Sequence, residues 1–273
     1  MSSQDVASAG GAPEPGSFDS TVAHPARVYD YWLGGKDNYA ADRAAGDQVI
    51  EANPSVPDGV RANRAFLRRA VRYLAGEAGI RQFLDIGSGL PTNENTHEVA
   101  QEIAPDARIV YVDSDPIVLA HGRALLNSSP QGATAYVQAD ARDTGTILRE
   151  AAQTLDFSAP VAIMALLVLH YVPDSDHPHQ LVARLLDAVP PGSFLAISEA
   201  TTAIDGERAA AGAARLNARL GSARSTLRSR AEIARYFDGL ELVEPGLVPM
   251  PQWRNPGDPL VAAVLAGVGR KPA

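Results

Sequence analysis

The feature that most constrains this chain is a short apolar segment that runs directly into two closely spaced glycines. Residues 81–91 are Arg-Gln-Phe-Leu-Asp-Ile-Gly-Ser-Gly-Leu-Pro. In a strand, Phe83 would face one side of the sheet, and Leu84 and Ile86 the other. Apolar side chains on both faces predict a strand buried on both sides in a parallel sheet. Because such a sheet needs helices on both of its faces, the segment predicts an α/β fold.

The two glycines predict a ligand-binding turn at the end of this strand. Gly87 and Gly89 let the backbone turn sharply and approach a ligand without a Cβ in the way. Pro91 suits the first turn of a helix, which we expect to continue to about Ala104. A strand, a glycine turn and a helix in this order hold nucleotide-like cofactors at the helix N-terminus. A tight turn that binds no ligand is the alternative.

The residues around the turn indicate what kind of cofactor it suits. A dinucleotide fingerprint needs a third glycine, which residues 87–92 (Gly-Ser-Gly-Leu-Pro-Thr) lack, and no P-loop lysine follows. Asp85 stands at the strand end just before the glycines. Its carboxylate would repel a pyrophosphate and attract a ligand that carries an ammonium group.

The rest of the chain alternates between apolar segments and helical patterns, which predicts a doubly wound sheet. We expect further strands at residues 108–113, 134–138, 161–169 and 193–199, and an antiparallel closing pair at 240–248 and 261–268. We expect helices near residues 24–33, 40–52, 58–76, 115–126, 178–189, 203–220 and 229–237, and one that starts near 144. The helix at 203–220 is rich in alanine and suits a lid.

Three regions follow from this pattern. Residues 1–22 are rich in Ser, Ala, Gly and Pro and predict a disordered tail. Residues 23–76 predict an N-terminal helical cap, in which the arginines of the third helix form a solvated face. Residues 77–273 predict the cofactor-binding catalytic domain.

Three further side chains stand at strand ends, where ligands bind in open α/β sheets. Asp113 ends the second strand, and its carboxylate can accept hydrogen bonds from both hydroxyls of a ribose. His170 follows the fourth strand and is a candidate general base, with a structural role as the alternative. Glu199 ends the fifth strand, either as a substrate contact or as a cap.

Composition excludes several classes of protein. A formal net charge of −8 argues against general nucleic-acid binding. The chain has no cysteine, so it has no disulfide or thiolate chemistry, and a cytoplasmic location is expected. No apolar run approaches the length of a membrane span, so no membrane partner is expected. His177 and His179 lack nearby partners for a metal, so no metal site is predicted.

Two sequence blocks carry a family resemblance. The Asp-x-Gly-x-Gly pattern at 85–89 resembles the first motif of class I S-adenosylmethionine-dependent methyltransferases, although Pro91 replaces that family's usual third glycine. Residues 27–43 (RVYDYWLGGKDNYAADR) and 84–101 (LDIGSGLPTNENTHEVAQ) resemble a bacterial family of S-adenosyl methyltransferases that was formerly catalogued as a domain of unknown function. Residues 266–271 resemble its closing strand.

The resemblance implies a fold and a cofactor. The fold is a Rossmann-like, seven-stranded and mostly parallel sheet with an antiparallel last strand, helices on both faces and an N-terminal helical cap. The cofactor is S-adenosylmethionine, with S-adenosylhomocysteine as its product. The resemblance also places the Asp140 carboxylate next to the adenine edge of the cofactor. The alternative is that Asp140 only caps the helix that starts near residue 144. The resemblance implies these cofactor-binding residues: Asp85, Gly87, Ser88, Gly89, Asp113, Ser114, Asp140, Ala141, Ala165 and Leu166.

The predicted function is methyl transfer to a small molecule. No N/D-P-P-[YF] motif follows the fourth strand, so a nucleic-acid substrate is not expected. A non-catalytic protein that binds S-adenosylmethionine as a sensor or partner is one alternative. An NAD-dependent oxidoreductase is another, opposed by Asp85 and the missing third glycine. Candidates for the substrate pocket wall are Tyr29, Tyr31, Asn38 and Glu199, together with Trp32, for which packing against the sheet is favoured.

Overall fold

The computed structural model describes residues 19–92, 94–125, 128–221 and 223–273, so most of the predicted N-terminal tail lies outside it. The strands are β1 (Gln82–Ile86), β2 (Arg108–Asp113), β3 (Ala133–Gln138), β4 (Ala162–Leu166), β5 (Phe194–Ala200), β6 (Glu241–Leu242), β7 (Val248–Pro249) and β8 (Val264–Arg270). The α-helices are α1 (Pro25–Leu33), α2 (Ala40–Ala52), α3 (Val56–Arg72), α4 (Thr96–Ile103), α5 (Pro116–Leu125), α6 (Thr144–Ala151), α7 (Pro178–Asp187), α8 (Gly206–Asn217) and α9 (Arg230–Ala234).

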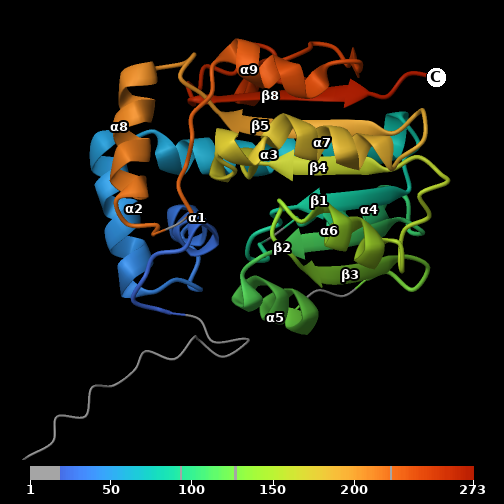
Figure 1. Cartoon of the computed structure of the whole chain (residues 1–273), viewed down its shortest axis with the longest axis horizontal. Helices are drawn as coiled ribbons and strands as arrows, with labels where there is room; N and C mark the ends of the chain where they lie inside the picture. Colours follow the sequence, from blue (N-terminus) through green and yellow to red (C-terminus); the bar gives the residue numbers. More distant parts are fainter. Residues whose placement is uncertain (1–18, 93, 126–127, 222) are drawn as a thin grey trace, which may run out of the picture.

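The strands form one sheet in the order β3-β2-β1-β4-β5-β8-β6, with β7 also paired to β8 (Figure 1). β1 to β5 are parallel, whereas β8 runs antiparallel to β5 and inserts between β5 and β6. The predicted α/β fold with an antiparallel last strand is therefore confirmed. No helix among the described residues is long and apolar enough to span a membrane.

The strands are buried on both faces because helices cover each side of the sheet. On one face, Phe83, Tyr111 and Met164 join an apolar cluster with α3 and α4. On the other face, Leu84, Val110 and Ile163 join a second cluster with α6, α7 and α9. Figure 1 shows α6 and α7 in front of the sheet and α3 behind it. The alternation of side chains along each strand produces this division.

A third apolar cluster lies beyond the strand ends. Ala23, Val28, Ala45 and Val49 of the N-terminal segment pack there against Leu216 and Leu220 in and after α8. α2 and α8 lie side by side at the left of Figure 1. The cap is therefore assembled from both halves of the chain, while α3 belongs to the layer on the sheet.

The helix after the glycine turn begins later than predicted. α4 starts at Thr96, so Pro91 does not occupy its first turn. Asn95 is the N-cap, and Glu98 Oε2 accepts a hydrogen bond from the Asn95 N–H at 2.7 Å. This capping box supplies the start signal that Pro91 was expected to give.

Two predicted strand boundaries are wrong. β4 ends at Leu166, because Leu167 has a positive φ of 53° and residues 169–171 form a 3-10 turn. The expected strand at 240–248 is replaced by the short strands β6 and β7, which pair with the two ends of β8. Among the residues that the structure describes, the sheet therefore contains eight strands, where seven were predicted.

The loop that follows β7 packs against α3. Trp253 is fully buried, and its ring meets Phe66 edge-on with centroids 5.4 Å apart. Arg69 Nε donates to the Trp253 carbonyl at 2.7 Å, and its guanidinium also reaches the Met250 carbonyl at 3.1 Å. Arg69, predicted to be part of a solvated face, therefore holds a distant loop onto the helix.

We predict that Phe66→Ala destabilises the protein by about 3–5 kcal/mol, the usual loss for a buried phenylalanine. Phe66 is fully buried at the junction of α3 with the Trp253 loop, so its removal leaves a cavity that neighbours cannot fill. Urea unfolding should measure the loss. Ile103→Ala, at a side chain that is 39% exposed, is the control and should change stability little. Equal effects of the two substitutions would contradict this account.

Candidate functional site

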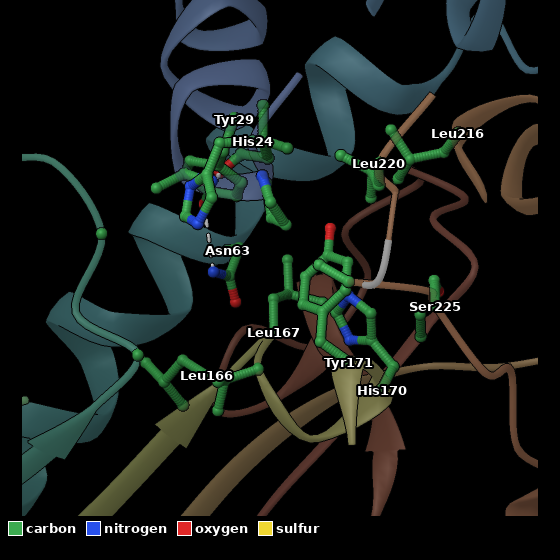
Figure 2. Close-up of a pocket in the computed structure, with 18 of the residues that line it drawn as sticks. His24, Tyr29, Asn63, Leu166, Leu167, His170, Tyr171, Leu216, Leu220 and Ser225 are labelled. Carbon is green, nitrogen blue, oxygen red and sulfur yellow. Dashed lines mark hydrogen bonds between the residues drawn. The ribbon is translucent and has the colours of Figure 1, made fainter. Parts of the chain in front are cut away.

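A cavity of about 850 Å³ lies at the carboxyl ends of β1, β2 and β4 (Figure 2). This edge of a parallel sheet is where ligands bind in open α/β folds. One part of the cavity is lined by the loops that follow the strands, and the other by α1, α2, α3 and α8. The two parts differ in polarity.

The glycine turn forms the floor of the polar part. Gly87 and Gly89 have positive φ values of 71° and 67°. The Gly87 N–H donates to the Val112 carbonyl at 2.8 Å, which joins the ends of β1 and β2. A Cβ at Gly87 would lie 2.4 Å from Val168, whereas a Cβ at Gly89 would meet nothing within 4 Å. The turn therefore leaves room for a ligand beside Gly89.

Asp85 is a buried carboxylate that faces the cavity. Thr96 Oγ1 donates to its Oδ2 at 2.6 Å, and no cation among the described residues forms an ion pair with it. Burial raises its pKa to about 6, because desolvation outweighs the hydrogen bond from Thr96 and the attraction of Arg64. A ligand cation would replace the lost solvation of this charge.

Asp113 is held by two backbone groups. Its Oδ2 accepts from the Gly89 N–H at 2.9 Å, and its Oδ1 accepts from the Asp115 N–H at 3.0 Å. Burial raises its pKa, although both hydrogen bonds act in the opposite direction. Each carboxylate oxygen keeps a further lone pair for a ligand hydroxyl. Ser114 lies beside it in the cavity wall.

Asp140 also lines the cavity and is held by Arg142. Arg142 Nε donates to its Oδ1 at 2.8 Å and a second guanidinium nitrogen to its Oδ2 at 2.6 Å. The bond from Arg142 lowers the pKa of Asp140, so this carboxylate stays ionised. Asp143 caps α6 by accepting from the Thr146 N–H at 3.0 Å, so the cap alternative for Asp140 does not apply.

Most of the predicted cofactor residues therefore come together. The cavity wall includes Asp85, Gly87, Ser88, Gly89, Asp113, Ser114, Asp140, Ala141 and Leu166. Ala165 is outside it, because its side chain points to the α7 side of the sheet and joins the second apolar cluster. Their roles in binding the cofactor stay predictions.

Two residues predicted for the substrate pocket line the second part of the cavity. The Tyr29 hydroxyl donates to the Val60 carbonyl and accepts from Asn63 Nδ2, both at 3.1 Å (Figure 2). Burial raises the pKa of Tyr29. Trp32 lines the cavity too, while its indole N–H donates to the Gly46 carbonyl at 3.2 Å and packs α1 on α2.

The other three residues predicted for the pocket wall lie elsewhere. The Tyr31 hydroxyl donates to Asp47 at 2.6 Å, which turns it away from the cavity. Asn38 Nδ2 donates to Asp30 at 2.8 Å and stabilises the loop between α1 and α2. Glu199 is fully buried under the cavity. These placements correct the sequence interpretation, which had no information on side-chain direction.

The sequence interpretation missed several cavity residues. Asn63 and Arg64 on α3 line the cavity, and Asn63 was overlooked although it falls on the buried stripe between Val60 and Leu67. A polar residue on an apolar helix stripe was the available signal. His24 lines the cavity, and its Nδ1 lies 3.1 Å from Asp115 Oδ2. Only the folded chain brings these two residues together.

The second part of the cavity is mostly apolar. It is bounded by Val49, Val56, Leu216 and Leu220, with Tyr171 reaching in from the turn after β4. Figure 2 shows the Tyr171 hydroxyl pointing into the space between Tyr29 and Leu220. We call this part the apolar chamber. Among the residues that the structure describes, no group of three potential metal ligands is present.

Comparisons with known proteins agree with this geometry. The model of a protein family described as S-adenosyl methyltransferase matches residues 12–272. The crystal structure of a DUF574 family protein from Streptomyces avermitilis is 46% identical with a TM-score of 0.89, over 93% of this chain and 99% of that one. A crystal structure of a Thermobifida fusca protein is 44% identical with a TM-score of 0.84, over 93% and 96% of the two chains.

More distant matches show the fold alone. The plantazolicin methyltransferase BpumL, solved with SAH and a triazolic desmethylPZN analogue, has a TM-score of 0.53 at 11% identity, over 91% of this chain and 96% of that one. A search of curated proteins gave no match.

We predict that the affinity for S-adenosylhomocysteine falls roughly tenfold from pH 7.5 to pH 5, because Asp85 must be ionised to attract the ligand ammonium. Its pKa of about 6 in the free protein means that acid protonates it before ligand binds. Asp85→Asn should weaken binding at pH 7.5 and flatten the dependence, as measured by titration calorimetry.

Asp140→Asn is the matched control for this prediction. Asp140 lines the same cavity, but its lowered pKa keeps it ionised over this range, so the variant should keep the pH dependence of the wild type. Any small remaining slope in Asp85→Asn would come from Asp113, whose pKa is also raised. If the affinity of Asp85→Asn for S-adenosylhomocysteine falls with pH as steeply as that of the wild type, Asp85 is not the group that binds the ligand ammonium.

Proposed function

The chain belongs to the S-adenosyl methyltransferase family, and we propose that it methylates a small, largely apolar molecule held in the apolar chamber. It is an S-adenosylmethionine-dependent methyltransferase by this membership, so the NAD and sensor alternatives are not favoured. The observation that carries the proposal on substrate is the shape of the cavity. One continuous space joins the carboxylate-lined edge of the sheet to a chamber with apolar walls.

The residues at the sheet edge fit the cofactor. Asp85 is a desolvated carboxylate that no described cation pairs with, and it suits the ammonium of the methionine part. Asp113 is oriented by two backbone groups and suits the ribose hydroxyls. The open space beside Gly89 allows close approach of the ligand to the backbone. Arg64, which lines the same wall, suits the ligand carboxylate.

The reactivity of the cofactor determines what the protein must contribute to methyl transfer. When bound, the cofactor supplies a methyl group on a positively charged sulfur, which is already activated for transfer. The residues of this chain therefore have to orient the acceptor and exclude water, and orientation alone supplies about 7–11 kcal/mol. Leu216 and Leu220 line one side of the chamber and Tyr29 another, so largely apolar surface faces the acceptor.

The dimensions and charge of the site support a small molecule. The chamber is part of a cavity of about 850 Å³ lined by α1 and α8, which is the size of a small-molecule site, and the formal net charge of −8 disfavours a nucleic acid. The walls offer mostly apolar contact with a few polar groups from Tyr29, Asn63 and Ser225, which is typical of small-molecule pockets.

We predict that Ala213→Trp abolishes methyl transfer and preserves cofactor binding. Ala213 lines the cavity from α8, so an indole there occupies the chamber and leaves the sheet edge free. Transfer of labelled methyl groups into a low-molecular-mass metabolite extract should fall about a hundredfold or more, as for a misplaced acceptor. Affinity for S-adenosylhomocysteine, measured by calorimetry, should stay at the wild-type value.

Ala214→Trp is the matched control, because Ala214 is the next residue on α8 and is exposed to solvent. It should bind and transfer like the wild type. If Ala213→Trp transfers normally, the acceptor does not bind in the chamber. If the wild type binds the cofactor and no extract supports transfer, the protein acts as a binding protein instead.

A further inference from the structure

His170 occupies a distinctive place at the boundary of the two parts of the cavity. It follows β4 in the 3-10 turn formed by residues 169–171, and its carbonyl accepts from the Thr226 N–H at 2.6 Å. The residue is buried, yet its side chain lines the cavity. In Figure 2 the imidazole lies beside Tyr171, between Leu167 and Ser225. The turn therefore presents one edge of this ring to the ligand space.

The other edge of the ring faces a buried carboxylate. His170 Nδ1 lies 3.8 Å from Oε2 of Glu199, which is fully buried on β5. Both atoms are inaccessible to solvent, and neither has a hydrogen-bond partner among the described residues. At 3.8 Å the pair is an ion-pair contact rather than a hydrogen bond, and catalytic hydrogen bonds are often long before the ligand is bound. A buried pair of this kind indicates that a proton belongs between the two groups.

Arg228 fixes the position of Glu199. Its guanidinium is almost fully buried and donates to Glu199 Oε1 at 2.8 Å, to the Leu169 carbonyl at 3.0 Å and to the Val172 carbonyl at 2.7 Å. It also donates to Asp174 Oδ1 at 2.9 Å. The carbonyls of Leu169 and Val172 lie on either side of His170, so one guanidinium orients both the carboxylate and the turn that carries the imidazole.

Arg228 pairs with the two carboxylates of this cluster. One is that of the buried Glu199 and the other is that of the exposed Asp174. Tyr171 packs against His170 with ring centroids 4.2 Å apart and the ring planes tilted by 46°, and Tyr236 lies near Glu199 and Arg228. Burial raises the pKa of both tyrosines, so both stay neutral. The imidazole Nδ1 therefore lies beside a carboxylate whose other oxygen is held by Arg228.

We infer that His170 is the general base of the reaction, with Glu199 as the positioning residue that holds its Nδ1–H and leaves Nε2 free for the acceptor. The acceptor class that follows is a hydroxyl group on an apolar molecule, which must lose its proton to become a methyl ether. This inference rests on the proposed methyl transfer in the apolar chamber.

The step balances in atoms and charge. The acceptor O–H bond breaks and its proton moves to His170 Nε2. An oxygen lone pair forms the new bond to the methyl carbon, and the electrons of the broken carbon–sulfur bond stay on sulfur. The products are the methyl ether, neutral S-adenosylhomocysteine and an imidazolium beside Glu199, which returns its proton to solvent after release.

The chamber around His170 suits a neutral hydroxyl. Its neighbours in the cavity wall are Leu167, Tyr171, Leu216, Leu220 and Ser225, which include no carboxylate to attract an ammonium substrate. The Tyr171 hydroxyl points into the same space and can donate to the acceptor oxygen. A hydroxyl would thus find one donor and one base within the same turn.

The first test reads the proton position directly by nitrogen NMR of the wild-type protein, without any substrate. We expect neutral His170 to be the Nδ1–H tautomer, with no proton on Nε2. The exposed His177 serves as an internal reference for the tautomer of a solvated imidazole. In Glu199→Gln the side-chain amide can donate to Nδ1, so the proton should move to Nε2. A wild-type His170 in the Nε2–H form would overturn the inference.

The second test measures methyl transfer to a panel of apolar phenols that includes 2-naphthol, with the corresponding methyl ethers as blanks. His170→Asn and Glu199→Gln should slow transfer by about 10²–10⁴-fold, the usual contribution of a general base. His177→Asn, the same substitution at an exposed histidine outside the cavity, should transfer like the wild type.

The outcomes separate this inference from the proposed function. Binding of S-adenosylhomocysteine at the wild-type affinity in His170→Asn supports a catalytic role, and loss of cofactor binding in that variant contradicts it. If His170→Asn transfers methyl groups as fast as the wild type, His170 is not the general base. If the wild-type protein methylates no phenol, the hydroxyl class is wrong. If it binds no S-adenosylhomocysteine at all, the proposed function itself fails.

Discussion

The connection between the carboxyl ends of β1 and β2 is the constraint on which the site depends. The Gly87 N–H donates to the Val112 carbonyl at 2.8 Å, and the Gly89 N–H donates to the Asp113 carboxylate at 2.9 Å. Both bonds require the positive φ values that glycine adopts easily. They hold Asp85 and Asp113 at one edge of the sheet and leave the turn open to a ligand. A side chain at Gly87 would collide with Val168 and move β4 away.

The cap covers part of this edge and so forms the second wall of the cavity. Val28, Val49, Leu216 and Leu220 form an apolar cluster that joins the N-terminal helices to the region of α8. The same cap reaches the strand-end side of the cavity through His24, whose Nδ1 lies 3.1 Å from Asp115 Oδ2. The hydrophobic contacts therefore position the chamber over the sheet edge, and the polar contact aligns it with the loop after β2.

Buried polar groups under the chamber carry an energetic cost that packing alone would avoid. Ser198 donates to Asn63 at 2.7 Å, and Glu199 is buried with Arg228. Replacing such groups by apolar residues is often neutral or stabilising, so their presence is more easily explained by a role at the site than by stability. These residues connect β5 to α3 and to the turn after β4, so the sheet fixes the positions of α3 and of this turn.

The sequence by itself determined the parallel sheet, the glycine turn and the carboxylates at the strand ends, because apolar periodicity and turn chemistry act over a few neighbouring residues. It also indicated the family through two continuous blocks of sequence. Only the tertiary structure decided which side chains line the chamber. Tyr31 and Asn38 lie in a recognisable block and point elsewhere, while Asn63 meets Ser198 across 135 positions of sequence. The direction of a side chain depends on such long-range contacts, which no local pattern contains.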